Sequence, residues 1–142
     1  MNRRSFIRIG MVGATTGIIA PESVLAGSMG QKISSNNMAG GVYYTKESPG
    51  RWSKKAGAHS PVMEKTEGGI HVVTGHPMNQ GKHWIVKHVL LDNDFNFIAE
   101  NIFDPKKDKA PISDFSLSGQ SGAVYALSVC NLHDSWLSML EL

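Results

Sequence analysis

The apolar positions of this chain fall in short runs rather than in long amphipathic stretches. The longest run covers residues 84–91 and is rich in β-branched residues, and the densest covers residues 123–129. Shorter β-prone runs occupy residues 42–45, 70–74, 96–102, 115–117 and 136–142. Turn-forming residues separate the runs, and no segment has a convincing helical period. This pattern predicts an all-β fold, an immunoglobulin-like antiparallel β-sandwich of about seven strands, with an antiparallel barrel as the alternative.

The N-terminal region has the layout of an export signal. Arg3 and Arg4 are the paired arginines of a twin-arginine signal, and an apolar stretch follows over residues 9–20. That stretch is too short to span a membrane, and the small residues at 24–26 form a cleavage site. We therefore expect three parts: a twin-arginine signal peptide at 1–26, a flexible segment rich in Gly, Ser and Asn at 27–40, and one folded domain at 41–142.

The formal net charge of +2 at pH 7 belongs to the predicted signal. Residues 1–26 hold three of the 14 basic residues and one of the 12 acidic residues, so their removal leaves a formally neutral chain. The remainder contains no basic stripe with interleaved aromatic residues, which argues against nucleic-acid binding. We expect a periplasmic protein with no membrane segment after signal removal. The twin-arginine route carries folded proteins, which favours a cofactor inserted before export.

The candidate chemistry centres on the only cysteine, Cys130. His133 follows three residues later, so a thiolate and an imidazole can reach one metal ion. A lone cysteine in an exported protein cannot form an internal disulfide, and a free thiol in an oxidising compartment is a liability unless it is buried or bound to metal. The alternative is a buried cysteine that acts as a small apolar side chain.

The six histidines separate into two groups. His71 and His88 lie inside strand-like runs, where a surface or hydrogen-bonded core residue is the more usual role. The other histidines lie in loops or in the turn after residue 130, where a rigid scaffold can hold ligands together; they are His59, His76, His83 and His133. One thiolate with four imidazoles is unlike a closed structural zinc site. Five ligands leave one octahedral position open, which suggests iron and a small-molecule reaction.

At this point the sequence resembles a family, over roughly residues 59–136. A Cys-Asn-x-His motif begins at Cys130, a His-Pro-Met loop begins at His76 with His83 shortly after it, and an early His-x-Pro-Val loop begins at His59. These motifs together resemble those of superoxide reductases, also called neelaredoxins, and of the iron domain of desulfoferrodoxin.

The resemblance implies an immunoglobulin-like sandwich and a mononuclear non-haem iron, one per chain. The implied ligands are four equatorial histidines, His59, His76, His83 and His133, and the axial Cys130. The implied reaction reduces superoxide to hydrogen peroxide, and the implied assembly is a homotetramer or a smaller homo-oligomer. The electron donor is an unknown periplasmic protein, for which a cytochrome or a small redox protein is a guess from the compartment.

The chain departs from the family pattern at several places, one of which is the seven-residue step from His76 to His83, where the family usually has six. Gly57 and Ala58 stand where the family usually has Glu-Lys, so the glutamate that can occupy the sixth iron position and the lysine that attracts superoxide are both absent. Lys54 or Lys55 can substitute for that lysine, or the two form a solvated charged pair. We name Lys55 as a catalytic candidate beside Cys130 and His59. Asp134 replaces the glycine common after the last histidine, and with one cysteine the second, four-cysteine iron centre is missing.

Three alternatives remain open from the sequence. A periplasmic blue-copper electron carrier would use Cys130, His133 and Met139, with His76 or His83 as the distant ligand. Such a copper site has no use for His59, whereas the iron site needs it. A non-catalytic sandwich module that binds a periplasmic partner would hold no metal. A family member that binds metal without useful turnover lies between these readings.

Overall fold

The computed structural model describes residues 38–79 and 81–142, and within them the predicted all-β sandwich is confirmed. A 3₁₀ segment and a one-turn helix come before the strands. The elements are η1 (Gly50–Lys55), α2 (Ala56–His59), β1 (Val62–Thr66), β2 (Gly69–Val73), β3 (Ile85–Leu91), β4 (Phe97–Ile102), β5 (Ile112–Ser116), β6 (Ala123–Cys130) and β7 (Ser135–Glu141).

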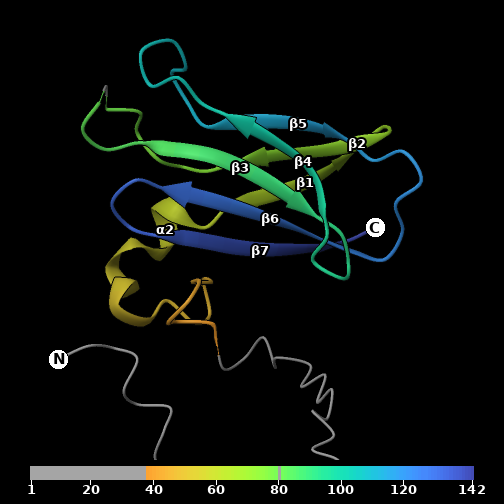
Figure 1. The fold of residues 1–142 in the computed structure, drawn as a ribbon, viewed down its shortest axis with the longest axis horizontal. Coiled ribbons are helices and arrows are strands. Elements are labelled where there is room, and N and C mark those ends of the chain that lie inside the picture. Colours follow the sequence, from red (N-terminus) through yellow and green to blue (C-terminus); the bar gives the residue numbers. More distant parts are fainter. Residues whose placement is uncertain (1–37, 80) are drawn as a thin grey trace, which may run out of the picture. The chain divides into compact units, whose positions relative to one another are not determined.

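The seven strands of the described residues form two antiparallel sheets (Figure 1). One sheet has the order β1-β2-β5 and the other has the order β4-β3-β6-β7. β3 and β6 are the inner strands of the larger sheet and pair with each other. Their apolar character follows from this position, because an inner strand packs against neighbours on both sides and covers the core.

Three local predictions differ from the structure. β1 (Val62–Thr66) was not expected, because it is an edge strand whose side chains are mostly exposed and polar, and only Met63 packs against the core. Residues 42–45 do not form a strand but make isolated bridges, one of them between Tyr44 and Trp136. The short helical turns from Gly50 to His59 were also not predicted from the hydrophobic pattern, because ten residues are too few to show a helical period.

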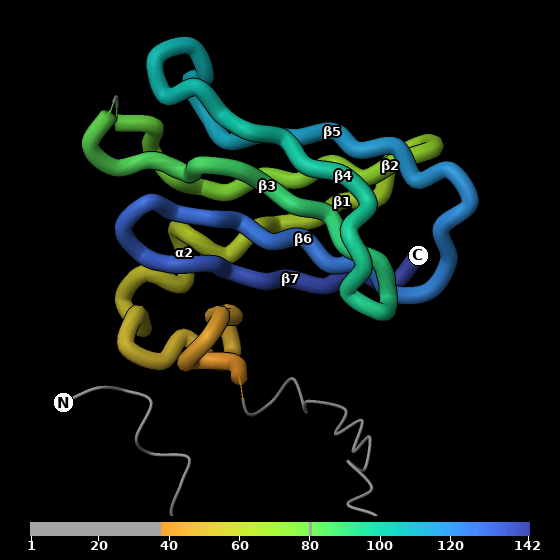
Figure 2. Tube along the Cα trace, in the orientation of Figure 1, coloured from red at the N-terminus to blue at the C-terminus, as the bar shows by residue number. Residues whose placement is uncertain are grey.

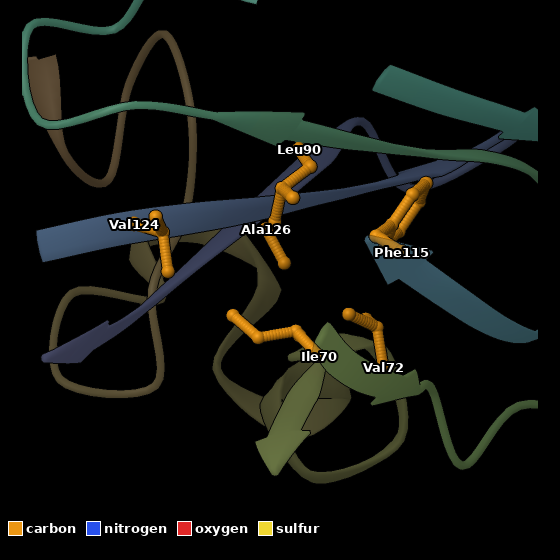
Figure 3. Close-up of a cluster of buried hydrophobic side chains, with 6 residues drawn as sticks. All are labelled: Ile70, Val72, Leu90, Phe115, Val124 and Ala126. Atoms are coloured by element: carbon orange, nitrogen blue, oxygen red, sulfur yellow. The ribbon is translucent and has the colours of Figure 1, made fainter. Parts of the chain in front are cut away.

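The main core lies between the two sheets. Six buried apolar side chains point toward one another from both layers, as Figure 3 shows: Ile70, Val72, Leu90, Phe115, Val124 and Ala126. They follow the alternation of their strands, since β5 and β6 bury every second residue. This cluster gives the two sheets a fixed separation.

A buried polar network lies in the same interface and contains His88. The Thr74 hydroxyl donates to Ser128 Oγ at 2.8 Å, so it accepts from His88 Nε2–H, also at 2.8 Å. His88 Nδ1 then accepts from the Ser113 hydroxyl at 2.9 Å. Both ring nitrogens therefore have partners, and His88 is a hydrogen-bonded core residue, as its place inside a strand suggested.

The loops that carry the remaining predicted ligands meet at one end of the sandwich. Val62 pairs with Val73, so the start of β1 lies beside the end of β2. Ile85 pairs with Cys130, so the start of β3 lies beside the end of β6. Figure 2 shows the yellow α2 segment, the green β2–β3 loop and the blue β6–β7 turn at this end, on the left.

The predicted signal peptide at 1–26 lies outside the described residues, as does the part of the 27–40 segment that precedes residue 38. Residues 38–40 are described, and the carbonyl of Met38 accepts a hydrogen bond from the backbone N–H of Val42 at 2.8 Å. In the part of the chain that the structure describes, no helix is long and apolar enough to cross a membrane.

Candidate metal centre

Four histidines and one cysteine from four separate segments meet at this end of the sandwich. His59 ends α2, Cys130 ends β6, and His133 lies in the turn between β6 and β7. His76 and His83 lie in the loop between β2 and β3. The ligand atoms of His59, His83, Cys130 and His133 all lie within 4.8 Å of one another, and His76 joins the group through His83.

The four imidazoles make three nitrogen–nitrogen contacts in series. His59 Nε2 lies 3.0 Å from His133 Nδ1, and His133 Nδ1 lies 2.9 Å from His83 Nε2. His83 Nε2 in turn lies 2.9 Å from His76 Nε2. Two nitrogens that each lie about 2.1 Å from one metal ion, at right angles, are about 3.0 Å apart. The spacing therefore fits neighbouring ligands of a single ion.

Backbone carbonyls fix which nitrogen faces the cluster in two of these rings. His59 Nδ1 donates to the carbonyl of Lys55 at 2.9 Å, and His76 Nδ1 donates to the carbonyl of Pro77 at 2.6 Å. A ring that donates through Nδ1 keeps an unprotonated Nε2 for a metal, and such bonds orient metal-binding histidines in general. The chain thus prepares both rings before any ion binds.

Burial keeps the four imidazoles neutral near pH 7. Desolvation lowers the pKa of His59 to about 4, and its hydrogen bond to Lys55 offsets only part of that shift. Desolvation is also the main cause that lowers the pKa values of His76, His83 and His133. Neutral imidazole is the form that binds metal, so the site selects the correct protonation state.

The donor set has more lone pairs than its own protons can satisfy. A neutral imidazole nitrogen either donates one hydrogen bond or accepts one. His83 Nε2 has a close nitrogen on both sides, so its single proton can serve His76 or His133 but not both. A central cation would receive all four lone pairs at once. The residues present therefore fit a bound metal ion.

Cys130 lies next to this group of nitrogens and is only 4 % exposed. Its Sγ is 3.7 Å from His133 Nδ1, and Ile85 and Phe103 pack around it. Trp136 is a fully buried core residue, and its ring lies tilted against that of His59 with the centroids 5.7 Å apart. The thiol therefore faces the imidazoles inside a largely apolar wall.

The desulfoferrodoxin family model matches residues 51–139, more than half of the chain and all five of these side chains. The chain belongs to the desulfoferrodoxin family. Among curated proteins, none matches the sequence.

Solved structures agree with this assignment. The superoxide reductase (neelaredoxin) of Ignicoccus hospitalis is 27% identical with a TM-score of 0.57, over 71% of this chain and 94% of that one. A variant of the same protein has a TM-score of 0.63 at 27% identity, over 71% of this chain and 93% of that one. The one-iron superoxide reductase of Giardia intestinalis, 23% identical with a TM-score of 0.53, covers 60% of this chain and 98% of its own and shows the fold alone.

The charge of Lys55 acts on the cluster of this desulfoferrodoxin-family chain. The positive charge of Lys55 contributes to the lowered pKa values of His76, His83 and His133. Lys54 is exposed, and its charge contributes nothing to the shifts of His83 and His133. Of the two lysines that the sequence left open, Lys55 is the one whose charge acts on His83 and His133.

Asn131 joins two ligand-bearing segments, a role that the sequence did not predict for it. Its Oδ1 accepts from the backbone N–H of Trp84 at 3.0 Å, and its Nδ2 donates to the carbonyl of Lys82 at 3.0 Å. These bonds bracket His83 and tie it to the turn that follows Cys130. The Cys-Asn-x-His spacing is the signal that points to this residue.

Asp134 has a backbone conformation that suits the glycine usual in the family. Its φ is +60°, and its carbonyl accepts from the N–H of Cys130 at 2.9 Å, which closes the turn. The left-handed region costs an ordinary L-residue roughly 1–2 kcal/mol, although Asp tolerates it better than most. Hydrogen bonds from Arg51 and then Trp52 hold the pKa of Asp134 below its usual range. Sequence reasoning missed both partners, which lie more than 80 residues away.

Met139, the axial ligand in the copper alternative, does not belong to the cluster. It is 57% exposed on β7 and pairs with Tyr125, whereas the end of β6 pairs with Ser135. Four ladder steps of about 3.4 Å each therefore separate it from the ligand end of the sheet. Met139 therefore cannot act as the axial ligand of a copper site at this cluster.

Proposed function

We propose that this protein is a superoxide reductase that reduces superoxide to hydrogen peroxide at a mononuclear non-haem iron. The observation that supports this most is that the ligand atoms of His59, His83, His133 and the buried Cys130 lie within 4.8 Å of one another, with His76 in contact with His83. Family membership makes iron and an oxidoreductase activity the natural expectation for that donor set. The proposed ligands are His59, His76, His83, His133 and Cys130.

The chain supplies the chemistry of the site through its donor atoms. His59, His76 and His83 would bind through Nε2 and His133 through Nδ1, because these atoms face the cluster. Five protein ligands leave one of six positions for the substrate. A bound ferrous ion would supply one electron, which with two protons converts superoxide to hydrogen peroxide, and an electron donor would return the ferric ion to ferrous.

Lys55 is the proposed guide for the substrate. Superoxide is a small anion, and the charge of Lys55 acts on three of the four imidazoles. A positive potential at the mouth of a site raises the association rate of an anion by roughly 10- to 10³-fold. The residue would therefore affect encounter more than the electron transfer itself.

Water is the proposed proton source. Gly57 and Ala58 offer no acid where the family has its Glu-Lys pair. The carboxylate of Asp134 follows His133 in sequence, but Arg51 and Trp52 already bind it. Product release in this chain then depends on solvent protons rather than on a carboxylic acid.

The cellular setting is also part of the proposal. We place the mature protein in the periplasm after twin-arginine export, with an unidentified periplasmic electron donor and a homo-oligomeric state, a tetramer by resemblance. The paired arginines at positions 3 and 4 carry the export proposal. Cell fractionation of the full chain, beside a variant with both arginines replaced by lysine, would test it.

The deciding experiment measures metal content and the visible spectrum of natively exported protein. We expect about one iron per chain and, after mild oxidation, a sulfur-to-iron charge-transfer band that Cys130→Ser abolishes. Copper with an intense blue band would overturn the iron assignment, and protein without metal would favour a binding module. Stopped-flow decay of superoxide then separates a reductase from an iron-binding protein without turnover.

A further inference from the structure

Three side chains link η1 to the turn after β6, and we call them the η1 clamp: Arg51, Trp52 and Asp134. Asp134 Oδ2 accepts from an Arg51 guanidinium N–H at 2.5 Å and from Trp52 Nε1–H at 2.8 Å. The Arg51 guanidinium also lies over the Trp52 ring, 4.8 Å from its centroid. Each member therefore contacts both of the others.

The clamp places an aromatic edge against one proposed ligand. The Trp52 and His133 rings lie 4.7 Å apart in an edge-to-face arrangement with an interplanar angle of 81°. On its other sides His133 contacts the rings of His59 and His83. Trp136 donates a hydrogen bond to the His133 carbonyl at 2.8 Å, but among the described residues Trp52 is the one ring outside the cluster in ring-to-ring contact with His133, so it limits rotation of that ring.

The rest of the η1 segment has few other attachments to the strands. The backbone N–H of Tyr44 donates to Ser135 and its carbonyl accepts from Leu137, which fixes the chain before η1. After η1 the chain reaches the cluster itself at His59. The clamp is thus a side-chain link between η1, which ends at Lys55, and the turn after β6.

Asp134 accepts these hydrogen bonds at a position whose backbone conformation favours glycine. With φ at +60°, the position would be satisfied by glycine, which has no Cβ penalty there. A glycine could not accept from Arg51 and Trp52. The aspartate therefore adds side-chain contacts at a place where the backbone favours their absence.

We propose that the η1 clamp fixes the ring plane of His133 and thereby slows the release of the bound metal. Asp134 and Arg51 are positioning residues that act through Trp52, and this inference rests on the proposed iron site. Outer residues that orient a metal-binding histidine typically change metal affinity by 10- to 100-fold. We expect the lower end of that range, because His59 and His83 still confine the ring.

The test compares Asp134→Gly with Asp134→Asn in the full exported chain. The glycine variant loses both clamp bonds but relieves the left-handed backbone, so its metal-free form should unfold at the same denaturant concentration or higher. Transfer of ferrous iron to a coloured chelator should be roughly 10-fold faster than in the natural chain. Asparagine keeps one acceptor for Trp52 and should fall between the two.

Glu100→Gln is the matched control, since it breaks another surface ion pair, Lys87–Glu100 at 2.8 Å between β3 and β4, without touching the η1 clamp. Iron release from it should equal that of the natural chain. If Asp134→Gly releases iron at the control rate, the clamp does not retain the metal and the proposal is overturned. Slower folding or a lower midpoint in Asp134→Gly with unchanged release would mark a purely structural link.

A second measurement reads the contact without any metal. In the metal-free protein, the ring-proton resonances of His133 should shift in Asp134→Gly, because the edge of Trp52 leaves, while those of His88 stay in place. Unmoved His133 resonances overturn the clamp even in protein that binds no iron. A natural chain that binds no iron overturns the proposed function instead, so the two failures are distinguishable.

Discussion

Two buried histidines in this protein have their pKa lowered to about 4 by the same cause, loss of solvent, yet their surroundings differ. His88 has a hydroxyl partner for each ring nitrogen. His59 Nδ1 has a carbonyl partner, but its Nε2 lies against the imidazole nitrogen of His133. The four imidazoles of the cluster have too few protons to hydrogen-bond all of their facing nitrogens. Burial and pKa alone therefore do not distinguish a structural histidine from a ligand.

The number of partners for each nitrogen does distinguish them. A polar group that is buried and fully hydrogen-bonded contributes to folding, whereas unprotonated imidazole nitrogens that lie close to one another fit a bound cation. The two buried histidine regions therefore have different roles. The network around His88 holds the sheets together, and the cluster around His59 is built for a metal.

The strongest way to break this comparison is to remove His59. In His59→Ala we expect ferrous-iron affinity to fall by on the order of 100-fold or more, because a ligand is lost rather than a supporting residue. The metal-free domain should remain folded, since the main core between the two sheets does not include this ring. Chelator competition measures affinity, and circular dichroism checks the fold. Unchanged affinity would place His59 outside the metal site.

The converse change removes His88. In His88→Ala we expect the free energy of unfolding of metal-free protein to fall by about 3 kcal/mol, because Thr74 and Ser113 lose their partner and a cavity remains. Urea titration measures this. Protein that still folds should bind iron with its usual affinity, and an equal loss of iron binding in both variants would contradict the division into two regions.

The pH dependence of the unfolding free energy tests the structural role of His88. Its pKa is about 4 in the folded chain and near 6.5 in the unfolded chain, so between these values the unfolded chain binds more protons. Stability is therefore complete above pH 6.5 and declines as the pH falls toward 4, by about 3 kcal/mol from this residue.

His88→Gln provides the control, because glutamine does not titrate and still offers hydrogen bonds. The gap in unfolding free energy between metal-free natural chain and variant should narrow as the pH falls from 6.5 to 4. The cluster histidines titrate in both proteins and cancel in this difference. A gap that does not change with pH would mean that His88 is protonated alike in the folded and unfolded chains.

The fold could be predicted from the sequence where burial of a strand requires a run of apolar residues. β3 and β6 are buried and apolar, and their runs were found to within about one residue at each end. β1 was missed because an edge strand needs only Met63 inside, and its other residues are free to be polar. The turns from Gly50 to His59 were missed because ten residues are too few to show a helical period.

Some residues of the candidate site could be predicted from the sequence and others could not. The candidate ligands were predicted because ligand spacing within loops is local, as in Cys130 and His133. The η1 clamp was not predicted, because Trp52 and Asp134 are 82 residues apart and only folding brings them together. Lys55 was one of two candidates, since a charge next to another charge in sequence gives no direction in space.

The smallest effect we expect separates those two lysines. Lys55→Ala should slow the second-order reaction with superoxide by roughly 10-fold at low ionic strength, because a positive charge that acts on the cluster is lost. Lys54→Ala, which removes an exposed neighbour of equal charge, should change the rate far less. Added salt should reduce the difference between the variants, since screening weakens steering. Pulse radiolysis over a range of salt concentrations measures these rates, and equal rates for the two variants at low salt would mean that net charge rather than the placement of Lys55 attracts the substrate.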